Sequence, residues 1–177
     1  MRDKALEIFN AGVAAADPFK AVTVNLQDIE PPALIIAVGK AARLMAKAAL
    51  DRFANTPCII VTNYENATDL VGATVYAAGH PVPDENGATA ARAVIAALQE
   101  ATGPVLALIS GGGSALLPAP AGKLTLADKA AVNELLLRSG REITAMNLIR
   151  QQLSELKGGG FLRLAAPQPV TALILSD

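Results

Sequence analysis

A short apolar run that breaks into three consecutive glycines is the feature that most constrains how this chain can fold. Residues 105–109 read Val-Leu-Ala-Leu-Ile, followed by Ser110, Gly111, Gly112, Gly113 and Ser114. The run predicts a buried parallel strand, with the glycines in a loop at its carboxyl end. Glycines leave backbone N–H groups unobstructed and the serines add hydroxyl donors, so the loop suits an anion. A tight turn that needs positive φ angles is the alternative interpretation.

Four further apolar segments predict the remaining strands, at residues 34–38, 58–62, 74–78 and 170–175. Segments with helical character lie among them, at residues 2–16, 41–53, after the 79–85 loop, 125–139 and 142–157. Thr125 with Asp128 predicts a capping box, and Asp84 and Glu85 are expected to cap the helix that follows them. Alternating strands and helices of this kind predict an α/β fold with a doubly wound parallel sheet.

Composition excludes several classes of partner. The net charge is −1, so no basic field would attract nucleic acid or an anionic membrane surface. Apolar residues make up 52% of the chain, yet no apolar run is long enough to span a bilayer and residues 1–16 do not resemble a signal peptide. The single Cys58 excludes an internal disulfide and is expected to be inert in the core. We therefore expect a soluble, cytoplasmic protein.

The two familiar nucleotide-binding motifs are absent from the sequence. Gly39-Lys40 is followed by Ala41, which does not fit a Walker A loop, and Leu116 stands where the dinucleotide fingerprint needs Gly or Ala. A bound nucleotide would need other loops. Lys40, at a strand-to-helix junction, is a candidate point charge for phosphate or carboxylate. A solvated lysine at the start of a helix is the alternative.

Further polar candidates lie on either side of the glycine run. His80 is the only histidine, which rules out a histidine-cluster metal site; it could orient a substrate or make a hydrogen bond within its loop. Asn147, Arg150, Ser154 and Lys157 recur at helical spacing, which predicts one polar stripe. An ordinary exposed helix face is the alternative.

Together these segments resemble the glycerate 2-kinase family, whose members carry a C-terminal MOFRL domain and are sometimes labelled hydroxypyruvate reductase. The matching motifs are Ala37-Val38-Gly39-Lys40-Ala41, Gly79-His80-Pro81-Val82-Pro83-Asp84, Ile109–Leu116, Asn147-Leu148-Ile149-Arg150, Leu153–Gly159 and Ser176-Asp177. The resemblance implies an ATP-dependent kinase that phosphorylates the 2-hydroxyl of D-glycerate, with Mg²⁺. It also implies that residues 1–177 form a Rossmann-like N-terminal domain.

The same resemblance implies roles for individual residues. Lys40 would be the active-site lysine, and Ser110–Ser114 would cradle phosphate. His80, Asn147, Arg150, Ser154 and Lys157 would line the substrate cleft, and Asp177 is a candidate metal ligand. A hydroxypyruvate reductase is the alternative enzyme, and a non-enzymatic anion-binding or remnant module is the alternative outside enzymes.

Two departures from the family bear on activity. Gln152 stands where the family usually has histidine, and members are more than twice this length. The loop after Ser176-Asp177, the remaining strands and the C-terminal domain with its catalytic arginine are not in the sequence. We therefore expect a truncated domain with little or no kinase activity alone. We also expect a homodimer through the apolar surface beside residues 170–175.

Overall fold

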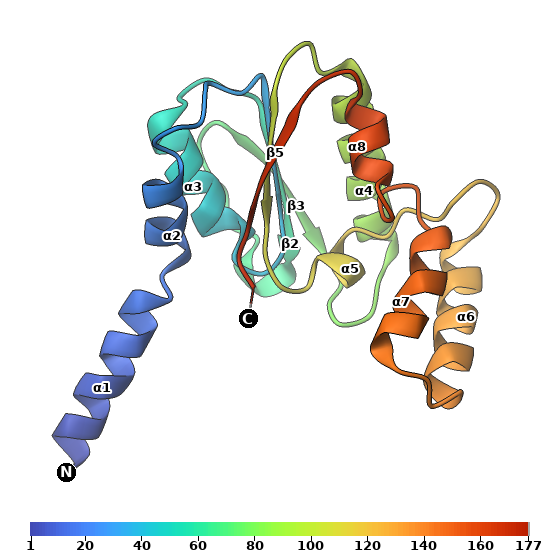
Figure 1. Cartoon of the computed structure of the whole chain (residues 1–177), viewed down its shortest axis with the longest axis horizontal. Coiled ribbons are helices and arrows are strands. Elements are labelled where there is room, and N and C mark those ends of the chain that lie inside the picture. The colour runs from blue at the N-terminus through green and yellow to red at the C-terminus, as the bar shows by residue number, and fades with distance from the viewer. Residues whose placement is uncertain (177) are drawn as a thin grey trace.

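The computed structural model describes residues 1–176, which form one sheet of five parallel strands (Figure 1). The strands are β1 (Leu34–Val38), β2 (Cys58–Asn63), β3 (Ala73–Ala78), β4 (Val105–Ile109) and β5 (Val170–Ile174). Their order across the sheet is β3-β2-β1-β4-β5, and every neighbouring pair is parallel. The predicted α/β fold is confirmed, and the boundaries of the strands differ from prediction by at most one residue.

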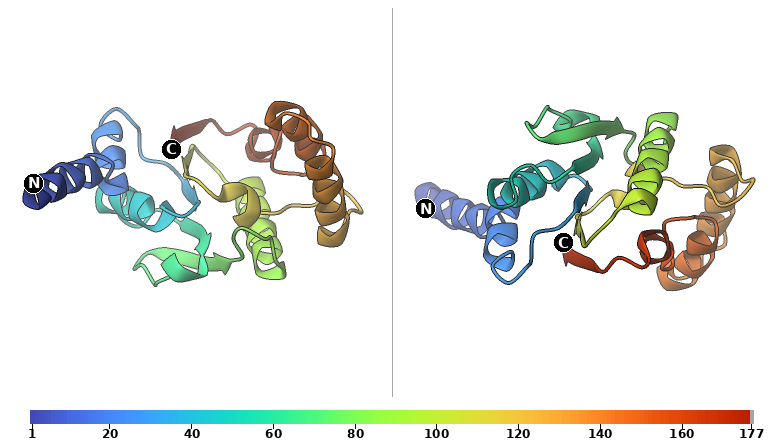
Figure 2. Two further views of the ribbon diagram at one scale, coloured as in Figure 1. Left: turned by 90° about the horizontal axis from the view of Figure 1, so that it is seen from below. Right: turned by 90° about the horizontal axis from the view of Figure 1, so that it is seen from above.

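Helices cover both faces of the sheet (Figure 2). The helices among residues 1–176 are α1 (Arg2–Ala15), α2 (Pro18–Asn25), α3 (Ala42–Arg52), α4 (Glu85–Glu100), α5 (Gly113–Leu116), α6 (Leu126–Arg138), α7 (Ile143–Gln152) and α8 (Gly160–Ala165), with a short 3-10 helix η1 at Tyr64–Asn66. Helices α2 and α3 pack on one face, and α4 and α8 pack on the other. The doubly wound arrangement follows from these two layers.

Strand β1 lies at the centre of the core and is buried along its whole length. Ile35 and Ala37 pack in the cluster beneath α3, whereas Ile36 and Val38 pack in the cluster beneath α4. A strand covered on both faces needs a continuous apolar sequence, which is why the apolar run at residues 34–38 predicted it. On β2, burial raises the pKa of the Cys58 thiol to about 12, so the thiol stays protonated and serves as packing.

Helix α2 was not predicted, because Asp17-Pro18 was interpreted only as a stop. Asp17 accepts hydrogen bonds from the backbone N–H groups of Phe19 at 2.9 Å and Lys20 at 3.3 Å. Pro18 occupies the first turn, where its missing N–H removes no helical hydrogen bond. The same dipeptide therefore ends α1 and begins α2.

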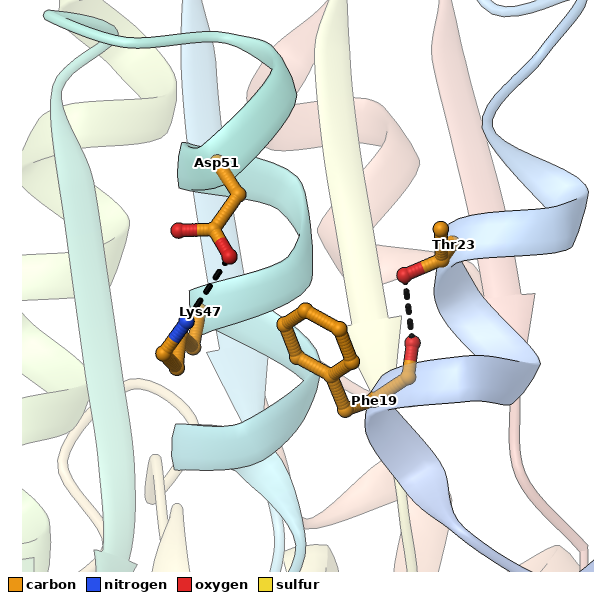
Figure 3. Close-up of polar contacts among 4 residues, drawn as sticks. All are labelled: Phe19, Thr23, Lys47 and Asp51. Atoms are coloured by element: carbon orange, nitrogen blue, oxygen red, sulfur yellow. Dashed lines mark hydrogen bonds and ion pairs between the residues drawn. The ribbon is translucent and has the colours of Figure 1, made fainter.

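Helix α2 lies against α3, and Figure 3 shows the polar edge of this contact. The Nζ atom of Lys47 on α3 lies 4.8 Å from the ring centroid of Phe19 and 2.7 Å from the carboxylate of Asp51. These groups are largely exposed, and exposed pairs contribute little to stability. Val22 and Leu26, both buried in the cluster under α3, hold α2 in place.

The predicted helix over residues 142–157 is wrong beyond Gln152. Leu153 ends α7, and the chain then runs beside the segment that follows α5. Glu155 N–H donates to Ala119 O at 2.9 Å, and Ala121 N–H donates to Leu153 O at 3.2 Å. Helix α8, which the sequence did not predict, packs against α4.

Helix α1 extends away from the body of the molecule (Figure 1). It contains no buried residue, so its apolar side chains contact solvent. None of the helices among residues 1–176 is both long and apolar enough to cross a bilayer.

Candidate functional site

The carboxyl ends of β1 and β4 lie side by side where the strand order reverses. From β1 the sheet extends through β2 to β3 on one side, and from β4 to β5 on the other. Ligands of open α/β sheets bind at this switch point, outside the carboxyl ends of the strands. Lys40 N–H donates to Gly111 O at 2.9 Å, so the two loops singled out in the sequence are bonded to each other.

Gly39 and Ser110 make the closest approach between these loops. Gly39 has φ +125°, and a Cβ there would lie 2.5 Å from the backbone oxygen of Ser110. Ser110 is buried, and its Oγ accepts a hydrogen bond from Ala41 N–H at 3.1 Å. The hydroxyl predicted to face an anion thus also ties the end of β4 to the start of α3.

The glycine loop presents backbone donors at the switch point. Gly112 has φ +94°, and α5 starts at the next residue. Within residues 1–176, the backbone N–H groups of residues 111–114 donate no hydrogen bond. Four adjacent N–H groups without an acceptor are available to bind an anion, and phosphate is commonly bound by such groups.

His80 lies beside this loop on a segment that follows β3. A Cβ on Gly112 would lie 3.1 Å from Cδ2 of the His80 ring, so the ring and the loop are in contact range. The side chain is exposed. The fold therefore places the sequence-predicted histidine beside the glycine loop, although it lines neither of the two cavities described below.

Lys157 reaches the same loop from the segment after α7. Its Nζ donates to Ser114 Oγ at 2.7 Å. Burial, together with the positive charges of Lys129 and Arg150, lowers the pKa of the Lys157 ammonium to about 8. A partly buried ammonium next to two other positive charges favours the binding of an anion beside it.

Two cavities adjoin the glycine loop and share Ser114 and Lys157 as lining residues. The first, about 510 Å³, has a mainly apolar wall from β4, β5 and α8, including Ile109, Ala172 and Phe161. The second, about 410 Å³, lies between the 81–83 loop and helices α6 and α7. The second cavity is also lined largely by apolar residues, but it includes more polar side chains than the first.

The predicted polar stripe is only partly brought together. Asn147, Arg150 and Lys157 line the second cavity, but Ser154 lines neither. Ser154 is buried, and its Oγ has no partner within the described residues, because α7 ends before it. The side chain of Lys40 is exposed and also lines neither cavity.

Sequence reasoning missed two polar residues of the second cavity. Lys129 and Asn133 lie four positions apart on α6 and both line it. Their spacing places them on one helix face, which was the available signal. Nothing in the sequence indicated that α6 would turn this face toward Arg150.

The described residues contain no group of three or more His, Cys, Asp or Glu side chains arranged to hold a metal ion. The candidate ligand Asp177 lies outside them. Its role as a metal ligand stays a prediction.

Residues 4–177 match a protein family described as a domain of unknown function, DUF4147. A relative from Agrobacterium vitis with the provisional name hydroxypyruvate reductase is 45% identical over 96% of this chain and 40% of its own length. A D-glycerate 2-kinase from Thermotoga maritima is 36% identical over 100% of this chain and 44% of its own length. The chain thus spans less than half the length of these relatives.

A crystal structure of glycerate kinase from Thermotoga maritima has the same fold. It superposes with a TM-score of 0.90 at 35% sequence identity, covering 96% of this chain and 42% of that one.

Proposed function

The chain belongs to the DUF4147 family, and we propose that it forms the N-terminal part of an ATP-dependent glycerate 2-kinase. The observation that carries this proposal is the glycine loop at the switch point, with four backbone N–H groups that donate to no residue of 1–176. The Thermotoga maritima relatives named glycerate kinases support the same reaction class.

In this proposal ATP, when bound, supplies the phosphoryl group that the 2-hydroxyl of D-glycerate accepts. The N–H groups of residues 111–114 hold phosphate oxygens, and Ser110 keeps the loop bonded to the start of α3. Lys40 and Lys157 place positive charge where negative charge grows during transfer. Asn147, which lines the second cavity, orients the acid, and His80 acts from its place beside Gly112 of the glycine loop.

The first cavity suits the nucleotide base, because its wall of β4, β5 and α8 is mostly apolar and opens onto the glycine loop. We assign no Mg²⁺ ligand within residues 1–176, and Asp177 remains the candidate that the family resemblance implies. The cytoplasmic location also remains a proposal.

An NAD(P)H-dependent hydroxypyruvate reductase is disfavoured. A dinucleotide fold needs Gly or Ala at position 116 for close packing of helix and strand, whereas this chain has a fully buried Leu116. The name of the Agrobacterium vitis relative is the observation in its favour.

A chimera tests the proposed reaction. This chain replaces the matched N-terminal part of the Thermotoga maritima D-glycerate 2-kinase, and the product is assayed for ATP-dependent formation of 2-phosphoglycerate. We expect activity that Lys40→Ala abolishes, whereas Lys47→Ala, at a partly exposed lysine of α3 that lines neither cavity, leaves it unchanged. A folded chimera that oxidises NADH with hydroxypyruvate and forms no phosphoglycerate would overturn the proposal.

The anion cradle is tested on the 177-residue chain alone. Inorganic phosphate is expected to shift the amide signals of residues 110–115 at millimolar concentration, about 4 kcal/mol of binding free energy. If those signals stay unmoved up to tens of millimolar, the loop is only a turn.

A further inference from the structure

Helices α6 and α7 form a hairpin that stands apart from the sheet (Figure 1). Two short antiparallel segments join it to the body, through the bonds of Glu155 N–H to Ala119 O and Ala121 N–H to Leu153 O. The second cavity lies between this hairpin and the body, with Lys129 on the hairpin side and Ser114 on the body side. A ligand there would contact both parts.

Three cations line this cavity. They are Lys129 from α6, Arg150 from α7 and Lys157 from the segment after α7. The described residues that line the cavity include no Asp or Glu, and none of the three cations forms a salt bridge within residues 1–176. Positive charges gathered in one place without a counter-charge repel one another, and a bound anion would relieve that repulsion.

The partial burial of these cations adds a second observation. Burial lowers the pKa of Lys129, and the Nε atom of Arg150 is buried with no hydrogen-bond partner among the described residues. Arg150 makes only a long contact, 3.4 Å from Nη1 to Asn147 Oδ1. A buried donor without an acceptor is costly, so an oxygen ligand in the cavity would recover that cost.

We propose that Lys129, Arg150 and Lys157 bind one oxyanion group of a small acid, and that this anion joins the α6–α7 hairpin to the body. The identification of the acid as the hydroxy acid substrate rests on the proposed function. Its carboxylate would sit among the three cations. The shared lining residues Ser114 and Lys157 place this group next to the glycine loop.

Binding to the 177-residue chain without nucleotide tests the site. D-glycerate, inorganic phosphate and uncharged glycerol are titrated separately while amide signals of α6 and α7 are followed. We expect D-glycerate to shift these signals and to slow their hydrogen exchange, and glycerol to do neither. If phosphate alone produces both effects, the site takes phosphate groups and the assignment to a carboxylate is overturned.

Lys129→Met is the decisive variant, and Lys123→Met is its matched control. Lys123 is exposed, lies before α6 and lines neither cavity. We expect Lys129→Met to weaken D-glycerate binding about tenfold, as for loss of one charged hydrogen bond. Equal affinity in the two variants would overturn the proposal. Circular dichroism and the midpoint of thermal unfolding confirm that both remain folded.

The chimera separates this inference from the proposed reaction. An active chimera whose KM for D-glycerate is unaffected by Lys129→Met overturns the oxyanion site alone. An inactive chimera, combined with Lys129-dependent binding of D-glycerate, overturns the reaction and supports the site.

Discussion

Gly39 shows how one residue sets the geometry of the candidate site. Its φ of +125° is a conformation that other residues rarely adopt, and its missing Cβ lets the β1 and β4 loops touch. The Lys40 and Gly111 backbones are bonded only because this approach is possible. The residue is therefore structural, although it lies beside the proposed active-site lysine.

Gly39→Ala is expected to destabilise the chain by about 2–4 kcal/mol, because it combines backbone strain with a clash against Ser110. Gly122→Ala is the matched control, since Gly122 also has a positive φ, +58°, but open space around its Cβ position. It should cost only about 1 kcal/mol. Urea unfolding measures both, and equal losses would contradict the close approach.

Lys157 is expected to titrate with a pKa of about 8, measured from its side-chain signals. Lys129→Met should raise this pKa, because it removes one of the neighbouring positive charges. In the parent chain, the lowered pKa of Lys157 also affects stability. Between pH about 8 and the ordinary value of 10.5 the unfolded chain binds more protons than the folded chain, so the free energy of unfolding rises with pH in that window. The rise should shrink in Lys157→Met. An unshifted Lys157 would contradict the cationic cavity.

At the scale of elements, Asp84 fixes the start of α4 and the loop that carries His80. Its Oδ1 accepts Gly87 N–H at 2.9 Å and its Oδ2 accepts the Tyr64 hydroxyl at 2.5 Å. Burial alone would raise the pKa of Asp84, but these hydrogen bonds lower it below the ordinary value. The predicted cap is confirmed.

Asp84→Ala is expected to cost about 1 kcal/mol of stability, whereas Asp84→Asn keeps the capping acceptor and should cost less. The contribution of the ionised form is complete above the ordinary pKa of 3.8 and is lost as pH falls through the lower folded value. Unfolding of the three proteins at neutral and acidic pH measures both effects. Identical stabilities for Ala and the parent chain would contradict the capping role.

At the scale of the whole molecule, β5 is a sheet edge with weak cover. Its residues are exposed or half-buried, and Ile174 is 70% exposed. Helix α1 adds further exposed apolar side chains. Apolar surface on an edge strand is a common site of association.

We expect the 177-residue chain to self-associate as a two-fold dimer at micromolar concentration, as seen by sedimentation. Ile174→Lys should weaken the dimer, because it places charge on the edge strand. Val71→Lys, at a position 97% exposed before β3, serves as the control and should have no effect. A parent chain that sediments only as a monomer would contradict the dimer.

The strands and most helices could be predicted because their signals are local. A central strand buried on both faces must be apolar throughout, and the residues 34–38 and 105–109 have that pattern. Asp84 and Thr125 were also predicted as caps from a local signal, because a capping side chain forms hydrogen bonds with its own helix. The glycine loop was found because three glycines directly follow a buried apolar run, which is a local pattern.

The candidate site could be predicted only in part, because its residues meet through tertiary contacts. The sequence indicated Lys40, the glycine loop and Lys157, but gave no sign that Lys157 would bond to Ser114, 43 positions away. It also extended α7 through Lys157, whereas the helix ends at Gln152 and Ser154 pairs with Pro120. The sequence did not indicate Lys129, because the packing of α6 against α7 decides which face of α6 lines the cavity.

The sequence by itself determined the strands, most of the helices, the α/β class and the position of the glycine loop, because hydrophobic patterning, capping and glycine conformation act over a few neighbouring residues. Only the tertiary structure decided the strand order, which puts β1 beside β4 and so joins the Lys40 and Gly111 loops. It also decided the gathering of Lys129, Arg150 and Lys157 around one cavity. Charges from separate elements meet only after the chain has packed, so no local pattern could specify them.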